Sequence, residues 1–161
     1  MRHHLLLVTP LLIASLASPQ TNPSPMGGTR VNHVAKGEFT VKLLPLAMEG
    51  QPEGAKLHRM SIDKTISGDL VAITTGQMLS AMTNVEGSAG YVAIERVEGS
   101  LHGKKGSFVL QHSGTMNRGA PLLLVTVVPD SGTDELVGLV GEFKIIIANS
   151  EHSYEFSYSL P

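Results

Sequence analysis

The sequence contains no cysteine and no tryptophan among its 161 residues. The missing thiols exclude disulfides, thiolate catalysis and cysteine-ligated metals. Aromatic residues make up only 4% of the chain, so aliphatic side chains and methionine must fill the core. Charged residues are also scarce at 16%, and the net charge is −2. This balance leaves no basic surface for nucleic acid or anionic membranes, so we expect no nucleic-acid partner.

What the sequence does contain is typical of one globular domain. Hydrophobic residues make up 42% of the chain, which is enough to bury a core and does not indicate disorder. The 17 glycines and 9 prolines indicate many turns.

The N-terminus has the layout of a secretory signal peptide. Arg2 precedes the apolar run Leu5–Ile13, and Ser15-Leu16-Ala17 fits a cleavage site of the small-x-small type. The run is shorter than the roughly 20 apolar residues of a membrane span, so no stable membrane anchor is expected. We predict cleavage after Ala17 and secretion, with an uncleaved signal anchor as the alternative. Residues 18–34 then form a flexible arm rich in proline, serine and glycine, and residues 35–161 form the folded domain.

Most of the folded part alternates apolar and polar residues with the period of a β-strand. The segments Pro121–Val128 and Phe143–Ala148 are instead apolar on both faces. Eight strands are predicted in all: Gly37–Leu44, Leu57–Ser67, Leu70–Gln77, Tyr91–Val97, Ser107–His112, Pro121–Val128, Phe143–Ala148 and Tyr154–Leu160. Met78–Val85 has helical spacing and predicts either a short helix or an irregular connection.

Short turns between consecutive strands imply antiparallel pairing. Closure of such a sheet into a barrel removes its exposed edges, and eight strands enclose just enough space for packed side chains or one small ligand. We therefore predict an all-β fold, a single antiparallel eight-stranded β-barrel. A two-sheet β-sandwich is the competing architecture.

The polar residues of the sequence concentrate in the hairpin between Tyr91 and His112. On its second strand Phe108, Leu110 and His112 share one face, so burial of the two apolar side chains would also bury the histidine. A buried imidazole needs a hydrogen-bond partner, and Glu95 on the first strand would supply it from the opposite position.

This placement predicts an interior pocket, whose candidate residues are Tyr91, Glu95, Gln111, His112 and Tyr158. A carboxylate–imidazole pair in it could perform general acid–base work. The alternatives are a purely structural buried hydrogen bond, or a Glu95 that faces outward and pairs with Arg96 or a lysine.

Neither a metal nor a cofactor is expected. The histidines at positions 58, 102, 112 and 152 are scattered and lack the spacing of a metal-binding motif. The glycines in Leu101–Gly106 are not spaced as in a dinucleotide-binding fingerprint, and no βαβ unit surrounds them.

The strands that are apolar on both faces predict an apolar patch on the barrel exterior. Leu123, Val125 and Val127, with Ile145 and Ile147 or their neighbours, would form it. Soluble monomers rarely expose such patches above a few hundred Å². We therefore predict cover by another copy of the chain, with Met78–Val85 or the N-terminal arm as the alternative cover.

Three segments together resemble a known family. They are GSAGYVAIERVEGSLHGKKGSFVLQHSGTM (87–116), VVPDSGTDELVGLVGEF (127–143) and the terminal Tyr-x-x-x-Tyr strand. The chain resembles domain of unknown function 3224 from Ala35 to Leu160. The resemblance implies a small barrel similar in fold to allene oxide cyclase, and it implies no agreed activity or catalytic residue.

Three functions are compatible with these sequence features. The first is a secreted barrel that binds a small apolar or amphipathic molecule without turnover. The second is a small isomerase- or cyclase-like enzyme that uses Glu95 and His112. The third is a non-catalytic structural oligomer. The absence of a catalytic motif favours binding, and whether the protein is an enzyme stays undecided.

Overall fold

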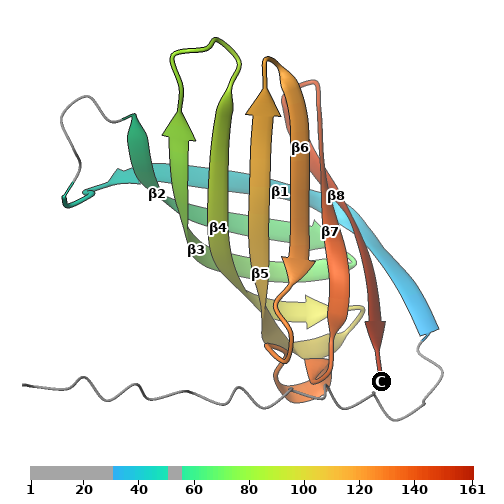
Figure 1. Cartoon of the computed structure of the whole chain (residues 1–161). Coiled ribbons are helices and arrows are strands. Elements are labelled where there is room, and N and C mark those ends of the chain that lie inside the picture. The colour runs from blue at the N-terminus through green and yellow to red at the C-terminus, as the bar shows by residue number, and fades with distance from the viewer. Residues whose placement is uncertain (1–30, 51–55) are drawn as a thin grey trace, which may run out of the picture.

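Eight strands form one closed antiparallel barrel (Figure 1). The computed structural model describes residues 31–50 and 56–161, so the predicted signal peptide and its cleavage site lie outside the described residues. Each strand pairs with its neighbours in the chain, and β1 pairs with β8 to close the sheet. The predicted eight-stranded barrel is confirmed, and the β-sandwich is not formed. The strands are β1 (Val31–Leu46), β2 (Leu57–Gly68), β3 (Leu70–Met82), β4 (Ala89–Leu101), β5 (Lys104–Asn117), β6 (Ala120–Val127), β7 (Val140–Ala148) and β8 (Glu151–Leu160).

Two local predictions are wrong. Met78–Val85 contains no helix, because β3 continues to Met82 and pairs with β4 from Met78↔Ala93 to Met82↔Ala89. Strand pairing over this length outweighs a weak helical spacing. The boundary of the arm also moves, since residues 31–34 belong to β1 and pair with the end of β8. The only helix in the described ranges is the single 3₁₀ turn η1 (Asp134–Leu136).

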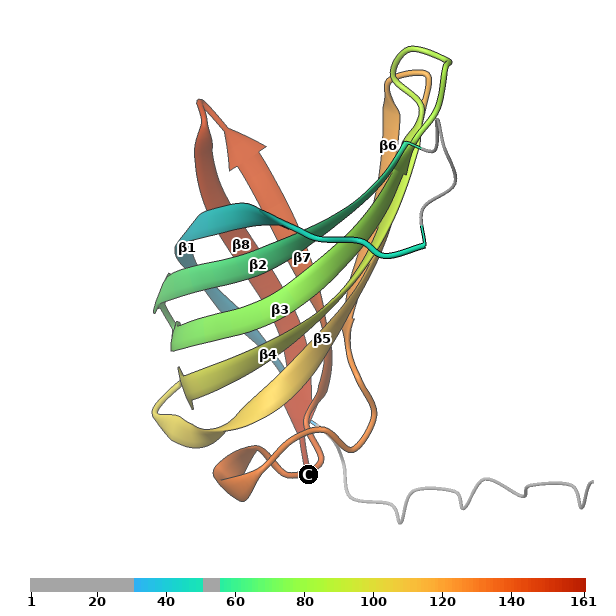
Figure 2. The same cartoon turned by 90° about the vertical axis from the view of Figure 1, so that its left-hand side faces the viewer.

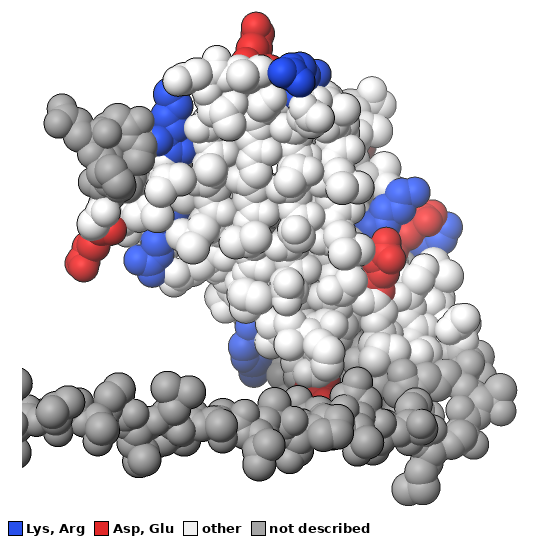
Figure 3. Space-filling model, in the orientation of Figure 1, with Lys and Arg blue, Asp and Glu red and all other residues white. Residues whose placement is uncertain are grey.

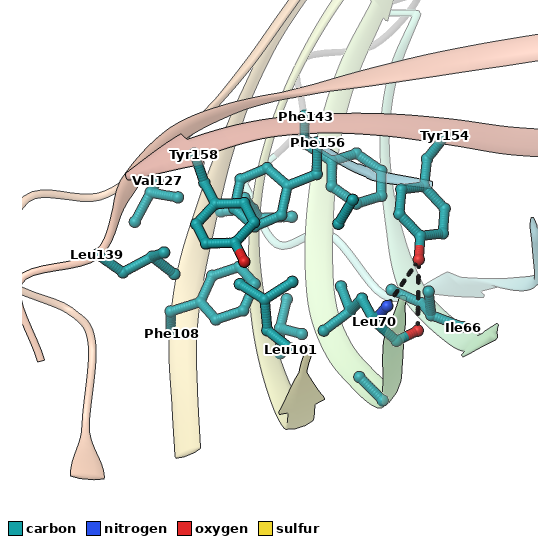
Figure 4. Close-up of a cluster of buried hydrophobic side chains, with 14 of the residues drawn as sticks. Ile66, Leu70, Leu101, Phe108, Val127, Leu139, Phe143, Tyr154, Phe156 and Tyr158 are labelled. Carbon is teal, nitrogen blue, oxygen red and sulfur yellow. Dashed lines mark hydrogen bonds between the residues drawn. The ribbon is translucent and has the colours of Figure 1, made fainter. Parts of the chain in front are cut away.

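An aliphatic and aromatic core fills the end of the barrel where η1 lies (Figure 4). Phe108 and Leu110 lie inside it, as predicted, at 1% and 0% exposure. Leu136 of η1 is also buried in this core. Rings from β5, β7 and β8 stack along it, with Phe143 against Tyr154 and Phe108 against Phe156. This end of the barrel is therefore a solid interior.

The opposite end of the barrel is open. β6 and β7 pair only at Thr126↔Glu142, whereas the other neighbouring strands pair over eight or more residues. Beyond that point the strands diverge, and Figure 2 shows the upper ends of β7 and β8 far from the upper end of β6. Side chains that point inward here remain partly or largely exposed: Val41, Leu43, Met60, Met78, Leu123 and Ile145. We call these six residues the apolar mouth.

The sequence predicted that Leu123, Val125 and Val127 of β6 face outward, but in the structure they face inward. Val125 and Val127 face the core and are buried. Their neighbours Leu122 and Leu124 are the outward residues, at 72% and 49% exposure. An apolar exterior patch therefore exists, formed by the other face of the strand.

Candidate functional site

Four polar side chains from four consecutive strands meet inside the barrel. They are Lys64 of β2, Thr74 of β3, Glu95 of β4 and His112 of β5, and each is at most 4% exposed. The Lys64 ammonium donates to Oε2 of Glu95 at 2.5 Å, and the Thr74 hydroxyl donates to Oε1 at 2.5 Å. Nε2 of His112 lies 2.9 Å from Oε2. We call these four residues the polar cluster, with Glu95 at its centre.

The strand register explains how these side chains come together. Glu95 lies opposite Gly76 on one side and Leu110 on the other, so it reaches His112 and Thr74 along diagonals. A Cβ atom at Gly76 would lie 2.5 Å from the Ile94 carbonyl oxygen and 2.9 Å from Cα of Glu95. Glycine at this position lets β3 approach the backbone of β4 closely beside Glu95.

The contact between His112 and Glu95 is close but poorly aligned. Nε2 of His112 is fully buried and makes no hydrogen bond of acceptable geometry, although the carboxylate oxygen is within 2.9 Å. Buried polar atoms normally have a well-directed partner, and each exception calls for an explanation. The contact is therefore electrostatic, at hydrogen-bond distance but not aligned as a hydrogen bond.

The environment keeps the Glu95 carboxylate ionised. Burial by itself raises its pKa, because a charged group loses its hydration. The contact with His112, the positive charge of Lys64 and the Thr74 hydroxyl together outweigh burial, so the pKa of Glu95 is lower than its ordinary value. The cluster thus contains an ion pair between Lys64 and Glu95 with an imidazole beside it.

Tyr91 lies on the inward face of β4, beside the polar cluster and at the same level of the barrel as Leu123 of the apolar mouth. Its ring is 6.5 Å from the His112 ring, and the residue is only partly buried. A Cβ at Gly114 would lie 2.3 Å from the Tyr91 ring, so the missing side chain makes room for that ring against β5. Burial raises the pKa of Tyr91 and the negative charge of Glu95 raises it further, so the phenol stays a hydrogen-bond donor.

The family model described as "Protein of unknown function (DUF3224)" matches residues 35–158. The chain belongs to this family. A solved structure of a DUF3224 protein of unknown function from Shewanella oneidensis MR-1 is 50% identical in sequence. The match covers 81% of this chain and 99% of that one, with a TM-score of 0.77. No curated protein matches the chain. The predicted family is confirmed, and the comparisons assign no ligand or activity.

The DUF3224 barrel separates two predicted pocket residues from the others. Gln111 faces outward and is exposed, because it alternates with the inward His112. Tyr158 is buried at the closed end, where its hydroxyl lies 2.7 Å from Nδ1 of His102 and its ring stacks on His33. Tyr91, Glu95 and His112 are brought together inside the barrel.

Two members of the polar cluster were not predicted. Lys64 shares a strand face with the buried Ile62 and Ile66, and a lysine on an otherwise apolar face is the pattern that could have found it. Thr74 follows Leu70 and Ala72 on the inward face of β3 in the same way. Neither pattern says which carboxylate the residue would meet, because that depends on register across the strands.

Within residues 31–50 and 56–161, no group of three or more histidine, aspartate or glutamate side chains could hold a metal ion. In the same ranges no helix is long and apolar enough to cross a membrane.

Proposed function

We propose that this DUF3224 barrel binds a small amphipathic molecule in its open half. The apolar part of the molecule lies against the apolar mouth, and its polar group approaches Tyr91 and His112. The observation that carries the proposal is the buried Nε2 of His112, which has no aligned hydrogen bond and lies on the same inward strand faces as the apolar mouth. Ligand sites commonly combine apolar walls with a few such polar groups.

The charges of the cluster favour a neutral polar group on the ligand. Lys64 and Glu95 already neutralise each other at 2.5 Å, so an anionic ligand would have to displace a buried carboxylate from its partner. A hydroxyl or carbonyl group can hydrogen-bond to the imidazole and the phenol without breaking this pair. The proposed ligand class is therefore an aliphatic alcohol or ketone.

A series of ligands with equal chain length tests this chemistry. Decanol, methyl octyl ketone, decanoate and decane compete with a bound apolar fluorescent probe. The chain has no tryptophan to interfere with that probe. We expect the alcohol and the ketone to bind best, by about tenfold over decane for one added hydrogen bond. Failure of every member to displace the probe, or a preference for decanoate, contradicts the proposal.

The variant His112→Phe tests the role of the imidazole. It should bind decanol and decane alike, because the group that distinguishes them is gone. Gln111→Leu is the matched control, since the neighbouring side chain lies outside the barrel, and it should keep the preference for decanol. Circular dichroism establishes that both variants are folded. An unchanged preference in folded His112→Phe would overturn the role given to the imidazole.

The contact between Glu95 and His112 supports a second candidate function, an isomerase- or cyclase-like reaction. An imidazole 2.9 Å from a carboxylate can accept a proton from a carbon next to a carbonyl and return it. The test is deuterium uptake into methyl octyl ketone in D₂O, followed by mass spectrometry. Uptake that disappears in His112→Phe supports catalysis, and binding without uptake leaves the protein a binder.

The proposal places binding outside the cytoplasm, on the strength of the predicted signal peptide Met1–Ala17. Native mass spectrometry of protein purified from its source tests this placement. A measured mass equal to that of residues 18–161 supports export, and a mass equal to that of residues 1–161 contradicts cleavage. The same spectrum reports any retained small molecule.

A further inference from the structure

The outer surface of β3 to β6 has an apolar patch that no segment within residues 31–50 and 56–161 covers. Five outward side chains form it, each 45–72% exposed: Leu79, Val92, Ile94, Leu122 and Leu124. They are neighbours across the strands, since Leu79 lies opposite Val92, and Val92 and Leu124 flank Ser113. Figure 3 shows this face as an uncharged expanse with lysine, arginine and acidic residues at its rim. We call these five residues the outer patch.

We propose that the outer patch binds a second copy of the chain and forms a two-fold symmetric dimer. Each aliphatic side chain of this exposure offers roughly 80 Å², so five supply roughly 400 Å² of apolar surface. This is about half of the ~800 Å² per partner in a standard-size interface. The five apolar side chains therefore supply the central half of such an interface, and the small and polar residues between them extend the same face.

The patch carries both a protrusion and a depression. Leu122 is 72% exposed and lies opposite Thr115 of β5. Beside them is a shallow depression of about 380 Å³, whose lining includes Gly90, Val92 and Thr115. In a two-fold interface the same surface meets itself, so Leu122 of each copy can enter the depression of the other. A protrusion and a depression on one face favour a second copy over an unrelated partner.

The polar residues of the patch are also self-complementary. Gln77 and Gln111 lie on either side of Ile94 in the register. The oxygen of Gln77 accepts hydrogen bonds from Arg59 at 2.7 and 3.0 Å, whereas an amide such as Gln111 both donates and accepts and can pair with its own copy. At the lower rim Arg96 and Glu98 carry opposite charges and lie 3.3 Å apart.

Light scattering of the purified full chain at micromolar concentration tests the proposal. The expected mass is twice 17.1 kDa. Leu122→Glu places a carboxylate in each depression and should give a monomer with an unchanged circular dichroism spectrum. Val137→Glu is the matched control. It places a glutamate at an exposed aliphatic position in the loop after η1, outside the patch, and this variant should remain a dimer. A monomeric wild type, a larger oligomer, or a dimeric Leu122→Glu overturns the proposal.

Thiol labelling tests independently whether the patch is covered, and it does not depend on whether Leu122→Glu folds. Because the chain has no cysteine, Ile94→Cys introduces a single thiol at the centre of the patch. Labelling by a maleimide should be slow at micromolar concentration and should become fast on dilution. Val137→Cys should label fast at both concentrations. Fast labelling of Ile94→Cys at every concentration shows that the patch is uncovered, and it also overturns the proposal.

Discussion

Replacing Glu95 with glutamine is the sharpest perturbation of the polar cluster. The substitution keeps the size and shape of the side chain and removes its negative charge. Lys64 then remains in the interior with an ammonium group and no counterion, while its side chain is 2% exposed. The Thr74 hydroxyl can still hydrogen-bond to the amide, so the change isolates the loss of the ion pair.

The magnitude follows from the burial of both partners. Removing one member of a buried ion pair costs about 3–5 kcal/mol, because the remaining charge is uncompensated. In a chain of this size each kcal/mol lowers the thermal midpoint by about 2–4 °C, so we expect Glu95→Gln to unfold about 6–20 °C below the wild type. Adding Lys64→Met should restore much of this loss, since no charge then remains unpaired.

The same pair makes the stability depend on pH in one direction. The folded-state pKa of Glu95 is lower than its ordinary value of 4.5. Its contribution to the free energy of unfolding is therefore fully present above that value, and it is lost as the pH falls through the lowered folded-state pKa. The difference in stability between wild type and Glu95→Gln should be largest near neutral pH and should shrink in acid.

Thermal unfolding followed by far-ultraviolet circular dichroism measures both effects. Glu98→Gln is the matched control on the same strand, because its ion pair with Arg96 is exposed at 67% and 51%. Exposed pairs contribute about 0–1 kcal/mol, so this variant should behave like the wild type. If Glu95→Gln unfolds no earlier than Glu98→Gln at neutral pH, the reasoning about the buried pair is wrong.

Two further predictions concern packing and buried hydrogen bonds. Gly99→Ala should lower the free energy of unfolding by about 1–3 kcal/mol, because the added Cβ would lie 2.1 Å from the Val71 carbonyl oxygen. Gly90→Ala on the same strand has its nearest neighbour at 3.7 Å and should be tolerated. Tyr154→Phe should cost about 1–3 kcal/mol by leaving the buried Leu70 amide without its acceptor at 2.9 Å. Urea unfolding measures the stability of all three variants. Equal stability of the two glycine variants would contradict the packing assignment, and wild-type stability of Tyr154→Phe would contradict the hydrogen-bond assignment.

The barrel could be predicted because alternation and turns repeat along the chain. In the hairpin the inward positions of Phe108, Leu110 and His112 follow directly from a period of two. The inward orientation predicted for Glu95 is confirmed. Its predicted position opposite His112 is wrong, because Glu95 lies opposite Leu110 and reaches His112 diagonally. Register depends on where two strands begin to pair, which the alternation of one strand does not determine.

The remaining features depend on contacts between distant segments. Met78–Met82 has a spacing that suits one turn of helix as well as a strand, and only its pairing with β4 decides the conformation. The open end arises because β6 and β7 pair at a single position, which no local pattern reveals. Lys64 could have been suspected from its apolar strand face, but its ion pair requires β2, β3 and β4 to be assembled.

The central claim is that the imidazole of His112 meets the polar group of an amphipathic ligand inside the open half of the barrel. Imidazole nitrogen NMR of ¹⁵N-histidine-labelled protein during titration with decanol tests it most directly, with His112→Phe to assign the resonance. We predict a saturable shift of His112 Nε2 and no shift of His102, which lies at the closed end. A titration that leaves His112 unmoved while the barrel stays folded would contradict the claim.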